Sequence, residues 1–96
     1  MSETVAVGHH YRIKRFNVGP GADLGLRVHR HRTKHYMVLS GEARVTLGDD
    51  VRRVGPDTSI FVPFGMPHRL ENPGAGTLSV LEVQVGSNFD EDDDQL

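Results

Sequence analysis

The histidines are the residues of this chain best suited to chemistry, and three of them fall in one short stretch. These are His29, His31 and His35, and a further histidine, His68, follows in a second motif. Neutral imidazole is a common metal ligand and also carries protons near pH 7. On an extended strand His29 and His31 share a face, with Cα atoms about 7 Å apart, so their rings can converge on one metal ion. The stretch predicts either a metal site or, because Arg and Lys surround it, a basic strand edge.

The second motif reads P-x-G-x-x-H-x-x-x-N and runs from Pro63 to Asn72. Pro63 and Gly65 predict a tight bend between two strands, because proline fixes one backbone angle and glycine tolerates positive φ. His68 then begins the next strand, where rigid backbone aims its side chain. This spacing is far more specific than the histidine stretch alone. It predicts that His68 meets His29 inside one closed sheet.

The elements that must position these motifs are expected to be short strands. No stretch shows the i, i+3, i+4 apolar spacing of a helix, and alternating or β-branched runs are broken by Gly, Pro, Asp and Asn. The expected strands are residues 11–18, 24–31, 35–39, 43–47, 51–54, 59–62, 68–71 and 77–85. Short strands at this spacing, without room for helical crossovers, predict an all-β sandwich or barrel. Periodicity leaves open which face of residues 34–39 points inward.

Length and composition narrow the class of protein further. A chain of 96 residues is enough for one domain, and we expect an arm at 1–10, a barrel at 11–86 and an acidic tail at 87–96. The net charge of −2 argues against nucleic acid as a partner. No apolar run is long enough to span a membrane. The absence of cysteine excludes thiolate chemistry, and without a secretory signal a cytoplasmic location is expected.

The histidine stretch followed by P-x-G-x-x-H is typical of the cupin superfamily, whose fold is the double-stranded β-helix, a jelly-roll barrel. Within it, the chain resembles the C-terminal domain of type II mannose-6-phosphate isomerases, usually fused to a mannose-1-phosphate guanylyltransferase. The segments that carry this resemblance are residues 11–15, 19–22, 29–36, 40–43, 68–74 and 81–87. It does not extend to the transferase half, so transferase activity is not carried over.

The resemblance implies a divalent metal held in the barrel by Gln, His and Glu of the first motif and His of the second. His29 and His68 match the two histidines. Arg27 stands at the Gln position, however, and Lys34 at the Glu position. A protonated Arg or Lys cannot ligate a metal. The chain therefore departs from the family at two of the four ligands.

Two interpretations of this departure remain open. In the first, Arg27 and Lys34 enter the barrel mouth and form a cationic pocket suited to a phosphate, a carboxylate or a sugar acid. In the second, the strand ends shift and His29, His31, His35 and His68 form a site for a divalent metal such as Zn, Ni, Fe or Mn.

The resemblance also implies an aldose–ketose isomerase acting on a sugar phosphate. Such a reaction needs a base with a pKa near neutrality, for which His31, His35 and Glu71 are the candidates. Arg32 and Arg69 match family arginines and are expected to hold the substrate, although a surface ion pair with Glu71 is an equal alternative for Arg69. Tyr36 is expected to form part of the pocket wall.

Two other functions compete with the isomerase, namely a non-catalytic cupin that binds a sugar or small anion and a metal-dependent dioxygenase. The resemblance implies a homodimer, for which the apolar residues at 24–28 and 37–39 are the expected surface.

Overall fold

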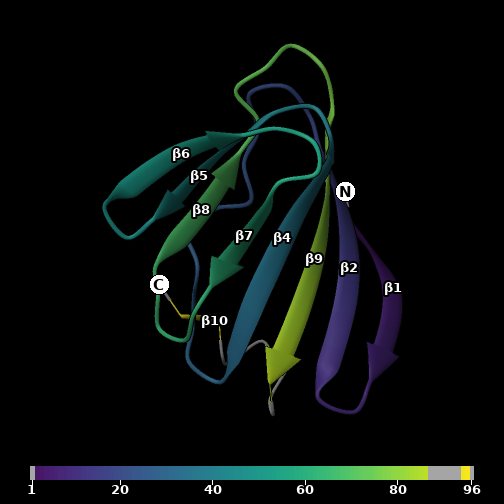
Figure 1. Cartoon of the computed structure of the whole chain (residues 1–96), viewed down its shortest axis with the longest axis vertical. Helices are drawn as coiled ribbons and strands as arrows, with labels where there is room; N and C mark the ends of the chain where they lie inside the picture. The colour runs from purple at the N-terminus through teal and green to yellow at the C-terminus, as the bar shows by residue number, and fades with distance from the viewer. Residues whose placement is uncertain (1, 87–93, 96) are drawn as a thin grey trace.

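The computed structural model describes residues 2–86 and 94–95, and within these ranges every regular element is a β-strand (Figure 1). The strands are β1 (Ser2–Gly8), β2 (Tyr11–Val18), β3 (Val28–His29), β4 (Arg32–Ser40), β5 (Ala43–Leu47), β6 (Asp50–Val54), β7 (Ser59–Val62), β8 (His68–Glu71), β9 (Leu78–Gly86) and β10 (Asp94–Gln95). The predicted all-β fold is confirmed. The described residues contain no helix that could cross a membrane.

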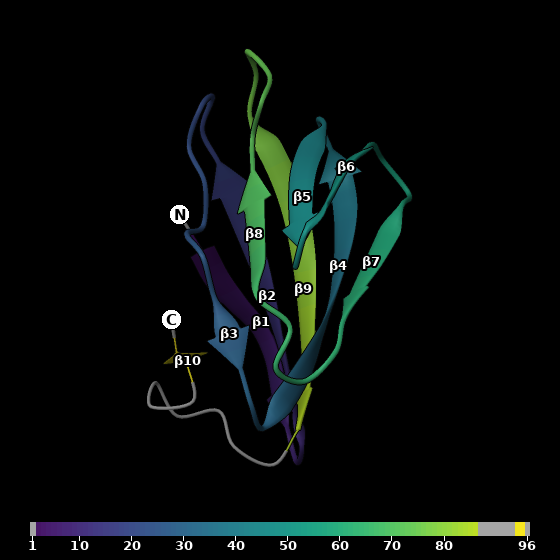
Figure 2. The same ribbon diagram turned by 90° about the vertical axis from the view of Figure 1, so that its left-hand side faces the viewer.

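Two sheets face each other and enclose the interior (Figures 1 and 2). The larger has the strand order β1-β2-β9-β4-β7, and the smaller has the order β6-β5-β8. Pairing is antiparallel throughout. Strand β3 pairs with β10 and lies next to the smaller sheet, because Arg27 just ahead of it forms a bridge with His68 of β8. The chain is thus a barrel of two layers, as the jelly-roll prediction requires.

The interior of the larger sheet changes from polar to apolar along its strands. One row of paired residues joins Arg12, Gln84, Lys34 and Val62 across β2, β9, β4 and β7, and the next joins Lys14, Glu82, Tyr36 and Ile60. The third row joins Phe16, Val80 and Val38. Because alternate residues of a strand share a face, all three rows point inward. One end of the barrel is therefore a hydrophobic core, and the other end is lined by charges.

The hydrophobic core sits at the apolar end and draws on both sheets. Its fully buried members are Val18, Tyr36, Val38, Ala43, Val45, Ile60, Val62, Leu70, Leu78 and Val80. Small and β-branched side chains dominate, which suits the close approach of two pleated surfaces. This packed end fixes the strands whose other ends carry the polar rows.

The structure changes three expected boundaries. Residues 2–8, expected as an arm, form β1 at the edge of the larger sheet. The strand expected at 24–31 shrinks to β3, because Gly25 adopts φ 80° and the Asp23 carboxylate accepts a hydrogen bond from its backbone N–H, which bends the chain. Strand β4 starts at Arg32, earlier than expected. Of the acidic tail expected at 87–96, only 94–95 belong to the described residues.

Candidate functional site

Backbone hydrogen bonds join the two histidine motifs. The N–H of Arg27 donates to the carbonyl of His68 at 2.9 Å, and the N–H of His68 returns a bond of 2.9 Å. Gly65, at φ 73°, donates its N–H to the carbonyl of His29 at 2.7 Å. The rings of His29 and His68 consequently lie with their centroids 5.6 Å apart, and both are buried. The expectation that these two imidazoles meet in the interior is confirmed.

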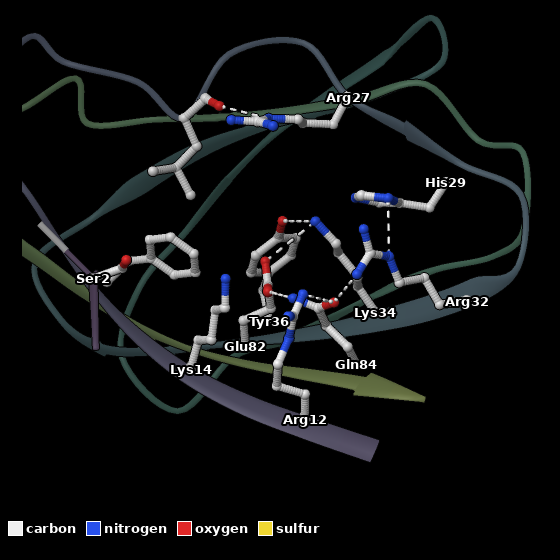
Figure 3. A pocket seen from close by; sticks show the side chains of 12 residues that line it. Ser2, Arg12, Lys14, Arg27, His29, Arg32, Lys34, Tyr36, Glu82 and Gln84 are labelled. Atoms are coloured by element: carbon white, nitrogen blue, oxygen red, sulfur yellow. Dashed lines mark hydrogen bonds and ion pairs between the residues drawn. The ribbon is translucent and has the colours of Figure 1, made fainter. Parts of the chain in front are cut away.

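A cavity of about 240 Å³ opens at the polar end of the barrel. In Figure 3, Arg27 and His29 approach it from one side, and the side chains of β2, β4 and β9 approach it from the other. The residues that line it are Ser2, Arg12, Lys14, Phe16, Leu24, Arg27, His29, Arg32, Lys34, Tyr36, Glu82 and Gln84. Five of these carry a positive charge, and Glu82 is the only carboxylate among the described lining residues. The described lining residues are therefore mostly cationic, in a chain whose net charge is −2.

Lys34 and Glu82 form a buried ion pair at the centre of the polar rows. The Lys34 Nζ lies 3.3 Å from a carboxylate oxygen of Glu82 and 3.5 Å from the Tyr36 hydroxyl. Lys34 is only 5% exposed and Glu82 1%. Burial alone would raise the pKa of Glu82, but the charge of Lys34 and hydrogen bonds from Gln84, Tyr36 and Lys34 outweigh burial and lower this pKa. The Glu82 carboxylate is therefore ionised at neutral pH.

The side-chain amide of Gln84 connects the arginines to this pair. Its Oε1 accepts hydrogen bonds from Arg12 at 3.1 Å and from Arg32 at 2.9 Å, while its Nε2 donates to the Glu82 carboxylate. One amide oxygen thus holds two guanidinium groups at fixed positions in the wall. Each guanidinium carries five N–H donors in a planar fork. Gln84 therefore holds the guanidinium groups of Arg12 and Arg32 in position.

The two histidines hold their protons on different nitrogens. The Arg32 Nε donates to His29 Nδ1 at 3.1 Å, so a neutral His29 carries its hydrogen on Nε2. The Nδ1 of His68 lies 3.0 Å from the Met66 carbonyl, to which it must donate, so a neutral His68 keeps its lone pair on Nε2. Only His68 is therefore in the tautomer that can ligate a metal through Nε2.

The residues at the cavity do not fit the divalent metal that the family resemblance implies. Protein metal sites are built from neutral or anionic donors, whereas five cationic side chains surround this cavity. The carboxylate of Glu82 is already neutralised by Lys34. Among the described residues, no three His, Asp or Glu side chains come together as a set of ligands. The structure thus favours the cationic pocket over the metal site.

Six of the residues singled out from the sequence meet at or beside the cavity. They are Arg27, His29, Arg32, Lys34, Tyr36 and His68. Lys34 and Tyr36 point inward because Val38, two residues further along β4, belongs to the core. This resolves the question of which face of β4 is internal.

The other four lie away from the cavity. His35 is on the outer face of β4, with its ring 4.8 Å from that of Phe61, and His31 is exposed in the turn before β4. The four-histidine arrangement does not form, because His31 and His35 follow the bend after β3 and do not continue its face. Glu71 and Arg69 point outward from β8, since Leu70 between them is in the core. Glu71 lies 3.8 Å from Arg44, a surface ion pair.

Sequence reasoning missed the charged and amide side chains that β2 and β9 contribute to the cavity, namely Arg12, Lys14, Glu82 and Gln84. A signal for them exists in the strand periodicity. On β9, the polar residues Glu82 and Gln84 alternate with Val83 and Val85, and on β2, Arg12 and Lys14 flank Ile13. Polar alternation normally indicates the solvent face of a sheet. Here it marks the interior of the barrel's open end.

Comparison with known sequences places the chain in a family. Residues 1–95 match the family model for the C-terminal domain of mannose-6-phosphate isomerase. A xanthan biosynthesis protein, XanB of Xanthomonas campestris pv. campestris, is 44% identical over 91 residues, which cover 95% of this chain and 20% of that protein. The mannose-1-phosphate guanylyltransferase ManC of Salmonella typhimurium is 42% identical over 91 residues, covering 95% of this chain and 19% of ManC. The chain spans about a fifth of the length of these relatives.

Solved structures agree on the fold. The cupin-2 domain Rru_A2000 of Rhodospirillum rubrum superposes with a TM-score of 0.85 at 26% identity, covering 99% of this chain and 63% of that one. The protein TT1209 of Thermus thermophilus gives a TM-score of 0.86 at 26% identity, covering 90% and 82% of the two chains. The chain is therefore a cupin barrel that belongs to the family of the mannose-6-phosphate isomerase C-terminal domain.

Proposed function

We propose that the barrel cavity binds a small phosphorylated sugar or a closely similar anion. The observation that carries this proposal is that, among the described residues that line one small cavity, five are Arg or Lys and one is a carboxylate. Arg and Lys side chains bind phosphate and carboxylate oxygens through charge-assisted hydrogen bonds. A ligand with one or two negative charges is complementary to these donors. Family membership supports a sugar phosphate as its chemical class.

The arrangement of donors supports a phosphate group near Arg12 and Arg32. A guanidinium binds two oxygens of a phosphate or carboxylate through its planar fork, and Gln84 holds both guanidiniums in place before any ligand arrives. Tyr36 and Glu82 supply a hydroxyl and a carboxylate for sugar hydroxyl groups. The cavity volume of about 240 Å³ lies below the ~300–1,000 Å³ of drug-sized sites. A small metabolite suits this volume better than a nucleotide.

An aldose–ketose isomerase is the second candidate, because Glu82 reaches the cavity and could move a proton between adjacent carbons. Its lowered pKa makes it a weak base while Lys34 remains beside it. We therefore expect binding of the sugar phosphate to be easier to detect than its conversion. A coupled assay that follows the conversion of mannose 6-phosphate separates the two candidates. A dioxygenase needs a metal that these residues do not fit.

Calorimetric titration with mannose 6-phosphate, inorganic phosphate and mannose tests the binding proposal. Mannose 6-phosphate is expected to bind at least tenfold more tightly than mannose, because charge-assisted hydrogen bonds to phosphate contribute about 1.5–3 kcal/mol each. Arg12→Gln should weaken the binding of mannose 6-phosphate about tenfold or more. Raising the salt concentration should weaken it further.

Arg69→Gln is the matched control, because Arg69 lies on the outside of β8 and should leave the affinity unchanged. Equal affinity for mannose and mannose 6-phosphate would contradict the proposal. So would an equal loss of affinity in the Arg12 and Arg69 variants.

A further inference from the structure

Lys34 occupies a central position among the oxygen donors of the cavity. Its Nζ lies 3.3 Å from Glu82 and 3.5 Å from the Tyr36 hydroxyl, and its partner across the sheet is Gln84. In Figure 3, the Lys34 ammonium, the Glu82 carboxylate and the Tyr36 hydroxyl point toward one another. A carboxylate and further oxygen donors around a buried positive charge are also what a hard divalent cation requires. The ammonium group already takes up these donors.

Arg32, which contacts His29, also disfavours a metal ion in this cavity. Arg32 donates from Nε to His29 Nδ1 at 3.1 Å and from a terminal nitrogen to Gln84 Oε1 at 2.9 Å. The first bond keeps the hydrogen of a neutral His29 on Nε2, and the second occupies the amide oxygen. Arg32 is buried, so neither bond exchanges easily with water. An imidazole and an amide that resemble metal ligands are thereby held as parts of a cationic network.

We propose that Lys34 is the resident cation of this cavity in place of a metal ion, so that anion binding is independent of metal. Lys34 balances Glu82 and presents its ammonium to the ligand, the two tasks that a divalent ion would otherwise combine. The anion half of this inference rests on the function proposed above, whereas exclusion of metal stands on the side chains alone. The exchange of Glu for Lys at position 34 then reverses the charge of the site while the barrel stays the same.

The test uses the full chain, without a histidine tag, and two titrations. A background carrying His9→Ala and His10→Asn removes the exposed histidine pair, whose rings lie 3.8 Å apart and could bind Zn²⁺ by themselves. Asn suits position 10, where φ is 72°. Titration of this protein with Zn²⁺ and with Mn²⁺ should show no stoichiometric site. Its affinity for mannose 6-phosphate should change less than twofold when EDTA is added.

A pair of variants in the same background probes position 34 directly. Arg27→Gln with Lys34→Glu restores the family residues at both positions and should give a Zn²⁺ or Mn²⁺ site, with a loss of affinity for mannose 6-phosphate of tenfold or more in the absence of metal. Arg27→Gln alone is the matched control and should gain no metal site, because Lys34 remains.

The outcomes separate this inference from the proposed function. Stoichiometric metal binding by the background protein overturns the inference, and so does anion binding that EDTA abolishes and metal restores. A folded double variant that binds no more metal than its control also overturns it. If the double variant does not fold, the background titrations decide. If no anion binds under any condition, the proposed function is wrong. Whether the cavity excludes metal is then decided by the metal titrations alone.

Discussion

At the scale of single residues, the buried ion pair Lys34–Glu82 neutralises the one carboxylate among the described cavity residues and contributes to the stability of the fold. Two charges taken out of water are tolerated because they lie 3.3 Å apart and share hydrogen bonds with Tyr36 and Gln84. Removing one member leaves the other buried without its compensating charge. This is far more damaging than removing both, which explains why an exchange at position 34 has consequences for Glu82.

Glu82→Gln is expected to destabilise the protein by about 3–5 kcal/mol at pH 7, since it breaks a buried ion pair. The pKa of Glu82 is lowered on folding, so its stabilising contribution is fully present above the ordinary glutamate pKa of about 4.3 and is lost as pH falls through the lower folded value. Urea unfolding from pH 7 to pH 3 measures this. The variant should lose less stability on acidification than the natural protein.

Glu71→Gln provides the control, because Glu71 is partly exposed and its ion pair with Arg44 spans 3.8 Å. An exposed pair contributes about 0–1 kcal/mol. Equal effects of the two substitutions would show that the Lys34–Glu82 pair does not stabilise the fold.

At the scale of elements, Asn72 secures the loop between β8 and β9 to the end of β2. Its Nδ2 donates to the carbonyls of Val18 at 2.9 Å and Gly76 at 2.7 Å, and its Oδ1 accepts the Gly74 N–H at 3.0 Å. Asn72 is 3% exposed. Its place at the end of the P-x-G-x-x-H-x-x-x-N motif follows from this loop, which begins where β8 ends.

Asn72→Ala should lower the free energy of unfolding by about 2–4 kcal/mol, because three hydrogen bonds are lost and the buried Val18 carbonyl loses its side-chain donor. Urea unfolding monitored by circular dichroism measures the change. Asp49→Ala, in an exposed turn, should change stability by less than about 0.5 kcal/mol. A loss at Asn72 no larger than at Asp49 would be inconsistent with the role described.

The elements also show what the sequence could predict and what it could not. The meeting of His29 and His68 was predictable, because a specific motif with Pro63 and Gly65 sets one strand against another. The inward direction of Glu82 was not, since alternation defines two faces of a strand without saying which is internal. His31 was misplaced because β3 ends at His29, where the chain bends before β4. The sequence identified Lys34 as a departure from the family pattern. It could not identify the ion-pair partner of Lys34, because Glu82 lies on a strand nearly fifty residues away.

At the scale of the whole molecule, the larger sheet leaves apolar side chains on its outer face. Phe61 is 50% exposed, and Tyr11, Met37, Leu39 and Val85 are exposed on strands of the same sheet. Of the surface expected for a homodimer, Met37 and Leu39 lie here, whereas Leu24 packs partly against the core. A second copy packed face to face would cover these side chains. We therefore propose this face as the dimer surface.

Phe61→Glu should convert a dimer to a monomer, because it places a charge in an apolar contact between two copies. Size-exclusion chromatography with light scattering, at several protein concentrations, measures the mass. Val51→Glu is the control, since Val51 is exposed on β6 of the smaller sheet. A natural protein that is monomeric at all concentrations, or a Phe61 variant that remains dimeric, would refute this surface.

Both described ends of the chain lie at the cationic cavity. Ser2 forms part of its wall, and Asp94 of β10 pairs with His29 of β3, two strands that lie next to each other in Figure 2. A polypeptide joined to either end would leave the barrel beside this cavity. The matched region makes up about a fifth of such relatives, and we propose that a domain joined at either end narrows the entrance to the cavity or adds side chains to it. Which molecules reach the cavity of such a barrel would then depend on the attached domain as well as on the barrel itself.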